Sequence, residues 1–254
     1  MEGWLLRSSA GASRRGNSVW ARRAVTDLPA AMAAVERFYA AVGSPPTFQI
    51  SPAFAPAALR AALDRDGYVD AGPTDVAVAD LTALRSALGR PASGQAETGP
   101  PRPSGRPDVG PALVGGPGLA LVSRSRIHGD WLAAVSPVMS TFGTEQRVNT
   151  LAVLSRLVVP QLYVTLFVDG RPVAAGRGTL DAGWLGIYSM ATLPEARGRG
   201  AATAVLGQLA DWAAEAGATR AYLQVEEKSG PARRLYAGLG FRPVYRYSYR
   251  RRAV

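Results

Sequence analysis

The most informative stretch of this sequence is Pro194-Glu195-Ala196-Arg197-Gly198-Arg199-Gly200-Ala201-Ala202. It lies between a segment of strand character and a segment with helical periodicity. Glycines permit a tight turn and a close approach of backbone to ligand. The first turn of a helix leaves several N–H groups without intrahelical partners, and the helix dipole adds positive charge there. Together with Arg197 and Arg199, the stretch predicts an anion site suited to a pyrophosphate.

Two other glycine-rich phosphate loops fit the stretch poorly. A dinucleotide-binding fingerprint needs Gly or Ala where Thr203 stands, together with an open parallel sheet. A P-loop needs Gly-Lys-Ser/Thr, and the single lysine, Lys228, follows Glu227. An ordinary tight turn in a glycine-rich protein is the remaining alternative.

The segments around the loop predict an α+β fold. Strands are expected at 162–168, 172–176 and 184–192, joined by turns at Asp169-Gly170 and Asp181-Ala182-Gly183. A helix over 201–216 carries its apolar residues on one face. A strand at 220–226, a helix at 231–239 and a strand pair over 241–252 complete the order β-β-β-α-β-α-β.

Two motifs give this order a family resemblance. Arg197-x-x-Gly200-x-Ala202 resembles the Q/R-x-x-G-x-G/A signature of the GNAT superfamily of N-acetyltransferases. Ser229-x-Pro231-Ala232-x-x-Leu235-Tyr236-x-x-x-Gly240-Phe241 resembles the second motif of that superfamily, N-x-x-A-x-x-L-Y-x-x-x-G-F. Both stand in the family's order and spacing. The resemblance covers residues 184–249 and implies a mixed, mostly antiparallel sheet flanked by helices, extending back to residue 119.

The resemblance implies an acyltransferase that moves an acetyl group from acetyl-CoA to a primary amine, by direct attack through a tetrahedral intermediate. Acetyl-CoA is then a co-substrate, and its pantetheine arm pairs with the strand end at Met190, Ala191 and Thr192. The pyrophosphate lies over the residues of the loop, which are Arg197, Gly198, Arg199, Gly200, Ala201 and Ala202. Ser229 replaces the family's usual Asn, which weakens one polar contact to the cofactor.

Acetyl transfer also needs a proton for the departing thiolate and a base for the amine. Tyr236 is the candidate acid, because its hydroxyl can donate a proton beside the thioester. Glu226 and Glu227 end a strand and are candidate bases, although the strand before the loop lacks the Glu often used there. A backbone N–H near Ala191 or Thr192 is expected to stabilise the oxyanion. The sole histidine, His128, is expected to be a surface or capping residue.

The N-terminal half repeats part of this pattern faintly. We expect a degenerate GNAT-like domain at residues 1–88, a Pro/Gly-rich linker at 89–118 and the GNAT domain at 119–254. Leu63 stands where Tyr236 stands in the second half, and no counterpart of the loop is found. Residues 68–81 suggest a terminal hairpin. Two unrelated α+β pieces are the alternative.

Composition limits the partners. The net charge is +10, from 29 basic and 19 acidic residues, but only the C-terminal end gathers arginines, so we expect a solvated strand there and no nucleic-acid site. The absence of cysteine excludes disulfides, thiolate zinc sites and cysteine nucleophiles, and no metal site is expected. With no leader or apolar run of about 18 residues, we expect a soluble cytoplasmic protein without a membrane partner.

Several questions stay open from the sequence. The amine acceptor is unidentified, and a homodimer is compatible with everything above. A non-catalytic acyl-CoA binding or sensing module is an alternative function, because the strand Glu and the motif Asn are both missing. A nucleic-acid-associated protein is a third hypothesis, which the alternating Tyr and Arg at 245–252 motivates.

Overall fold

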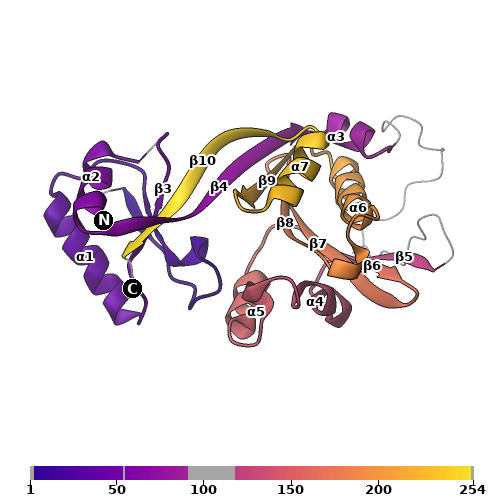
Figure 1. The fold of residues 1–254 in the computed structure, drawn as a ribbon, viewed down its shortest axis with the longest axis horizontal. Coiled ribbons are helices and arrows are strands. Elements are labelled where there is room, and N and C mark those ends of the chain that lie inside the picture. Colours follow the sequence, from indigo (N-terminus) through magenta and orange to yellow (C-terminus); the bar gives the residue numbers. More distant parts are fainter. Residues whose placement is uncertain (1–2, 54, 91–117, 253–254) are drawn as a thin grey trace.

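The computed structural model describes residues 3–53, 55–90 and 118–252. The expected linker therefore lies almost wholly outside the described residues. All ten strands of the described chain join one sheet, with helices on both faces (Figure 1). Within the described ranges, none of the helices combines the length and the apolar composition needed to cross a bilayer.

The second half of the chain follows the expected order closely. Its elements are β5 (Leu119–Arg124), α4 (Gly129–Val135), α5 (Arg147–Ser155), β6 (Gln161–Val168), β7 (Arg171–Asp181), β8 (Trp184–Thr192), α6 (Ala201–Glu215), β9 (Arg220–Glu226), α7 (Gly230–Gly238) and β10 (Arg242–Arg252). The β6–β7 turn contains Asp169 and Gly170 at φ +48° and +74°. Two successive positive φ values are what a two-residue hairpin requires.

The first half contains a shorter version of the same sequence of elements. These are β1 (Trp4–Leu6), β2 (Val19–Ala21), α1 (Leu28–Ala41), β3 (Thr47–Ile50), α2 (Ala57–Arg65), β4 (Tyr68–Asp80) and α3 (Leu81–Ala87). Asp27 caps α1, accepting a hydrogen bond from the Ala30 N–H at 2.9 Å. Short 3-10 turns occur at Arg15–Asn17, Ser140–Phe142 and Pro194–Ala196.

The sheet order reveals an internal two-fold relation. The strands lie in the order β1-β2-β3-β10-β4-β9-β8-β7-β6-β5. Exchanging β1 with β7, β2 with β8, β3 with β9 and β4 with β10 reverses the order of the first eight and keeps every parallel or antiparallel relation. The repeat expected from the sequence is therefore present in the topology.

The two long strands β4 and β10 link the halves (Figure 1). β4 pairs with β9 over Thr74–Asp80 on one edge and with β10 on the other, and the far end of β10 pairs with β3. We call β1–β3, α1, α2 and the strand ends beside them the N-terminal unit, and the remainder the C-terminal unit. A boundary at residue 88 stays a prediction, and the hydrogen-bonded sheet continues across both units.

Both expected terminal hairpins are wrong, because 68–80 and 242–252 are single strands that pair with each other. The first of these segments contains Gly72-Pro73, and both residue types are common in turns. In the structure Gly72 adopts φ +63° and the ladder with β10 is irregular opposite it, between Tyr247 and Tyr249. A bulge thus absorbs the turn-forming residues and the strand continues.

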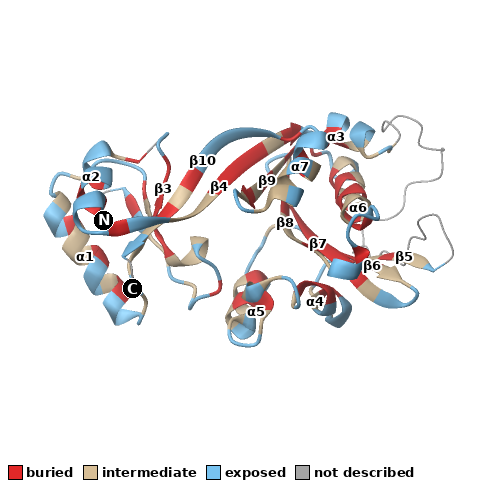
Figure 2. Ribbon diagram, viewed as in Figure 1, coloured by how far each residue is buried: buried red, intermediate tan, exposed pale blue. Residues whose placement is uncertain are grey.

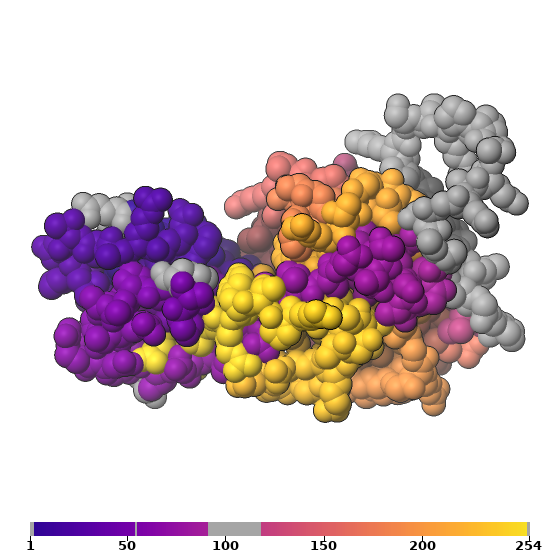
Figure 3. All heavy atoms as spheres, turned by 90° about the horizontal axis from the view of Figure 1, so that it is seen from above, coloured from indigo at the N-terminus to yellow at the C-terminus, as the bar shows by residue number. Residues whose placement is uncertain are grey.

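Four clusters of buried side chains stabilise the described part of the fold (Figure 2). Alternating residues of β6 and β7 divide between two of them: Leu162, Val164 and Ala174 pack with α3, α6 and α7, whereas Tyr163 and Ala175 pack with α4 and α5. These helix groups therefore cover opposite faces of the sheet. From above, residues of the first half lie against the yellow C-terminal residues along the middle of the molecule (Figure 3).

Candidate functional site

The parallel strands β8 and β9 separate before they end. They pair from Trp184 opposite Arg220 to Ile187 opposite Leu223, and the ladder stops there. Beyond that point β8 continues beside β7, and β9 continues beside β4. The facing edges of residues 188–192 and 224–226 therefore stand apart and leave an opening at the carboxyl ends of the two strands. Ligands of α/β sheets commonly bind at such an opening.

A bulge in β8 shapes its side of the opening. Ser189 has φ +51°, and the ladder with β7 shifts between Ala175 and Arg177. The Gly176 carbonyl accepts a 2.9 Å hydrogen bond from the buried Trp131 indole N–H. A Cβ on Gly176 would lie 2.5 Å from the Met190 sulfur, so only glycine fits without a rearrangement. These contacts fix the direction in which Met190 leaves the strand.

The loop between β8 and α6 is open to solvent. Gly198 and Gly200 have φ +71° and +79°, and a Cβ built on either meets nothing within 4 Å. No side chain caps the N-terminus of α6, where Gly200 is the cap residue. Arg197 and Arg199 are exposed and neither is among the ion pairs of the described residues. Free amides, a helix N-terminus and two unpaired guanidinium groups fit a diphosphate.

Thr192 and Arg197 brace this loop against β8. The Arg197 Nε donates a 3.2 Å hydrogen bond to the Thr192 carbonyl. Ala191 is buried with its side chain among the α4 and α5 residues, and Ala201 is buried at the start of α6. The backbone of these alanines, rather than their side chains, is therefore what each can offer to a ligand.

A cavity of about 810 Å³ reaches the opening between β8 and β9. It is lined from both faces of the sheet and from both units, by Arg7, Arg15, Phe142, Leu154, Arg177, Tyr188, Met190, Tyr222, Glu226, Ser229 and Tyr236 among others. The cavity thus brings together four residues singled out from the sequence, which are Met190, Glu226, Ser229 and Tyr236. The loop at 197–202 does not line it and lies on the exposed surface nearby.

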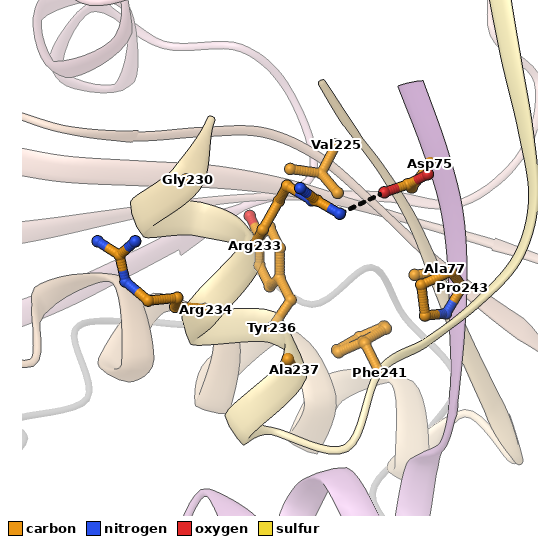
Figure 4. A pocket seen from close by; sticks show the side chains of 10 residues that line it. All are labelled: Asp75, Ala77, Val225, Gly230, Arg233, Arg234, Tyr236, Ala237, Phe241 and Pro243. Atoms are coloured by element: carbon orange, nitrogen blue, oxygen red, sulfur yellow. Dashed lines mark ion pairs between the residues drawn. The ribbon is translucent and has the colours of Figure 1, made fainter. Parts of the chain in front are cut away.

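Tyr236 lies on α7, between this cavity and a second one of about 330 Å³ (Figure 4). The residue is 9% exposed, and burial raises the pKa of its hydroxyl to about 12. No hydrogen-bond partner for that hydroxyl is found among the described residues. Tyr236 therefore holds a proton at neutral pH that is not committed to another protein group.

The two candidate bases, Glu226 and Glu227, lie in different surroundings. The Glu226 carboxylate lines the large cavity and forms ion pairs with Arg14 and, at 3.1 Å, with Lys228. The Glu227 carboxylate lies outside the cavity and pairs with Arg246 at 2.7 Å. Glu226 can therefore reach a ligand in the cavity, whereas Glu227 connects α7's preceding turn to β10.

Asp75 connects three elements behind α7. Its carboxylate receives hydrogen bonds from Arg246 of β10 at 2.7 and 3.2 Å, and forms a 3.1 Å ion pair with Arg233 of α7 (Figure 4). Asp75 itself belongs to β4 of the first half and is 4% exposed. The pair of guanidinium groups, Arg246 foremost, lowers the pKa of the Asp75 carboxyl. This cluster positions α7, and with it Tyr236, against β4 and β10.

We expect the Asp75→Asn variant to lose about 2–3 kcal/mol of unfolding free energy at pH 7, because two guanidinium groups lose their shared anion while remaining partly solvated. A carboxyl with a lowered folded pKa stabilises the fold above its unfolded pKa of about 3.9, and this contribution is lost as pH falls toward the folded value. Urea denaturation should therefore show the wild-type advantage shrinking between about pH 5 and pH 2. An equal advantage at pH 7 and pH 3 contradicts the electrostatic origin.

Most residues that line the large cavity could not be predicted from the sequence. Arg7, Arg15, Arg177, Tyr188 and Tyr222 come from four separate segments that only the fold brings together. Arg177 alone had a local signal, since it is a single charge inside the apolar run of β7. His128, as expected, precedes a helix: it is the N-cap residue of α4 and does not line the cavity.

Comparison with protein families gives one match. Residues 141–241 match the model of the acetyltransferase (GNAT) family. The match spans α5 and every element from β6 to the end of α7, so it includes the opening, the loop and Tyr236.

Comparisons with individual proteins cover the whole chain. An uncharacterized N-acetyltransferase of Bacillus subtilis, YobR, is 27% identical over 257 residues, covering 97% of this chain and 89% of that protein. A functionally unknown conserved protein from Staphylococcus epidermidis superposes with a TM-score of 0.64 at 12% identity, over 96% of this chain and 87% of that one. A tandem GNAT protein from the clavulanic acid biosynthesis pathway gives 0.61 at 15% identity, over 90% and 70%. The structural likenesses show that the fold is shared along both units.

Proposed function

Since this chain is an acetyltransferase of the GNAT family, we propose that it moves an acetyl group from acetyl-CoA to a primary amine by direct attack of the amine. The observation that carries the proposal is that three features follow one another from the end of β8: the exposed loop at 197–202, the opening between β8 and β9, and a cavity lined by Tyr236. A thioester that carries phosphates needs a phosphate site, a channel for its arm and a cavity for the reacting group.

The residues around the opening fit the parts of acetyl-CoA. The amides from Gly198 to Ala202 and the charges of Arg197 and Arg199 suit its pyrophosphate. The unpaired edge of Met190, Ala191 and Thr192 offers backbone groups to an amide-containing arm, and Ser229 adds a hydroxyl beside α7. When bound, acetyl-CoA supplies the thioester carbonyl that an amine attacks.

Side chains of the protein would donate and accept the protons of the reaction. Tyr236 keeps its proton at neutral pH and donates it to the leaving thiolate, acting as the general acid. Glu226 accepts a proton from the amine, directly or through a water molecule, and Glu227 is left to its ion pair with Arg246. A backbone N–H of Ala191 or Thr192 stabilises negative charge on the carbonyl oxygen.

The N-terminal unit would supply a wall of the acceptor site and no chemistry. Leu63, the counterpart of Tyr236, is fully buried in the core of that unit. Arg7, Ser13 and Arg15 of the same unit line the large cavity. The first unit therefore completes the cavity of the second.

Free thiol release tests the proposed function. The full chain is incubated with acetyl-CoA and a panel of primary amines, and coenzyme A is measured with a thiol reagent while mass spectrometry detects the acetylated amine. We expect thiol and N-acetyl product in equal amounts. Thiol release without N-acetylation of any amine would contradict transfer.

One observation favours a second function, a non-catalytic acyl-CoA binding module. Both candidate bases are engaged in ion pairs, Glu226 with Arg14 and Lys228 and Glu227 with Arg246, so neither offers a free carboxylate. Tight acetyl-CoA binding with no turnover on any amine would support this alternative.

A further inference from the structure

Three arginines from two distant segments of the chain line the large cavity. Arg7 follows β1, Arg15 begins a 3-10 turn, and Arg177 lies in the middle of β7. The Arg177 guanidinium stacks on the Tyr188 ring at 4.6 Å, and Arg15 approaches closely enough to interact electrostatically with Tyr188 and Tyr222. One end of the cavity is therefore rich in positive charge.

None of these guanidinium groups is neutralised within the described residues. Arg7 donates to the Ser18 carbonyl and hydroxyl and to the Gln49 amide oxygen, at 2.6–3.0 Å. Arg15 donates to the Tyr247 hydroxyl at 3.1 Å. Arg177 donates to the Gln161 amide oxygen at 3.0 Å. Every partner in these bonds is a neutral acceptor.

Two donors are left over at buried positions. Arg177 is 6% exposed, and the Nε atoms of Arg15 and Arg177 are buried without a hydrogen-bond partner in the described chain. Burying a charged group without a counter-ion is costly, and an anion bound beside the group offsets that cost. Consistent with that cost, burial lowers the pKa of the Arg177 guanidinium. Burial acts in the same direction on Arg15, but the neighbouring Tyr247 hydroxyl outweighs it and raises the Arg15 pKa.

The acidic residues of the cavity do not offset this charge. Glu226 is already paired with Arg14 and Lys228, and Asp181 is exposed at the end of β7. Neither carboxylate forms an ion pair with the three arginines. A polycationic amine would therefore meet repulsion inside the cavity.

Another part of the cavity lining is an apolar wall. It is formed by side chains between residues 139 and 159, which are Met139, Phe142, Val153, Leu154, Leu157 and Val159. A molecule that fills the cavity thus meets positive charge, hydrocarbon and the Tyr236 side chain.

We propose that the amine acceptor carries a carboxylate and an apolar body, with the carboxylate bound by Arg15 and Arg177. This proposal rests on the proposed acetyl transfer and names its substrate class. Both arginines line the cavity, and carboxylates accept hydrogen bonds from guanidinium groups in a planar, directional geometry. The apolar wall contacts the hydrocarbon part of the acceptor.

Matched amine pairs test the proposal. Each pair differs only in the carboxylate: phenylalanine with 2-phenylethylamine, leucine with 3-methylbutylamine, and 6-aminohexanoate with pentylamine. We expect the carboxylate member of at least one pair to have a kcat/KM higher by roughly 10- to 100-fold, the contribution of a charge-assisted hydrogen bond. Equal or better turnover of the decarboxylated member in every pair would overturn the proposal.

A variant pair assigns the effect to the cavity. The Arg177→Gln variant should lose the carboxylate preference, whereas Arg171→Gln, an exposed arginine of the same strand, should keep it. Arg15→Gln is the second cavity variant in case Arg177→Gln folds poorly. Retention of the full preference in both cavity variants contradicts the assigned binding site.

A readout without turnover separates this proposal from the proposed function. N-acetylphenylalanine should raise the Tm of the wild-type chain, and N-acetyl-2-phenylethylamine should raise it less. Protection by the carboxylate with no thiol release would leave the carboxylate-binding site standing and refute catalysis. Acetylation of neutral amines with no protection by any carboxylate would do the reverse.

Discussion

The Tyr236→Phe variant should acetylate amines at least about 100-fold more slowly than the wild-type chain, with its affinity for acetyl-CoA unchanged. In the proposed mechanism the hydroxyl donates a proton to the leaving thiolate, and general acids contribute about 10²- to 10⁴-fold. Because burial raises the pKa of this hydroxyl to about 12, the acid stays protonated through the neutral and mildly alkaline range. Wild-type kcat should therefore show no loss attributable to Tyr236 below about pH 11.

Stability and a matched variant separate catalysis from packing. The Tyr236 hydroxyl has no partner in the described chain, so its removal should change the free energy of unfolding by less than about 0.5 kcal/mol. Tyr68→Phe is the control, since the Tyr68 hydroxyl is also buried without a partner but lies in the N-terminal unit. A Tyr236→Phe rate equal to that of Tyr68→Phe would remove Tyr236 from the mechanism.

The Gly200→Val variant should weaken acetyl-CoA binding roughly 100-fold, which corresponds to about 2.7 kcal/mol. Gly200 has φ +79° at the start of α6, with open space where a side chain would project. A valine there would cover the amides that the diphosphate needs. It would also adopt a backbone conformation that costs a side-chain-bearing residue about 1–2 kcal/mol.

The opposite end of the same helix provides the control. Gly217 has φ +80° and equally open surroundings, so Gly217→Val carries the same backbone cost. Both variants should lose a similar amount of stability in urea, and only Gly200→Val should lose affinity in calorimetry. Equal acetyl-CoA affinities for the two variants would show that the effect is backbone strain rather than a blocked phosphate site.

Local sequence patterns were sufficient for the elements from β6 to α7. β9 begins and ends at the expected residues, and α6 differs from its expected end by one residue. The glycine loop could be proposed as a phosphate site because its chemistry is contiguous in the chain. The GNAT fold followed from two motifs at a fixed spacing, and the family match supports it.

Strand partners could not be predicted from local patterns. The segments 68–80 and 242–252 have strand character, but nothing in either one specifies that its neighbour is the other, more than 160 residues away. Glycine and proline occur both in turns and in bulges, so Gly72-Pro73 does not by itself distinguish a hairpin from a continuous strand. The pairing of β4 with β9 and of β10 with β3, which joins the two units, is thus visible only in the folded chain.

The large cavity could not be predicted from the sequence for the same reason. Its arginines indicate a binding site only once their burial is known, because an exposed arginine in an arginine-rich chain is common and indicates no particular function. Arg177 matters because it is 6% exposed and keeps a donor without a partner. Burial and hydrogen bonding, which follow from the tertiary structure, turn a common residue into a candidate binding group.

Titration calorimetry of acetyl-CoA into the full wild-type chain tests the central claim most directly. We expect one molecule bound per chain, with a Kd of roughly 1–100 μM and with inorganic pyrophosphate competing for the same site. Absence of binding heat at acetyl-CoA concentrations up to about 1 mM, at two temperatures, would contradict the assignment of residues 197–202 as the diphosphate site.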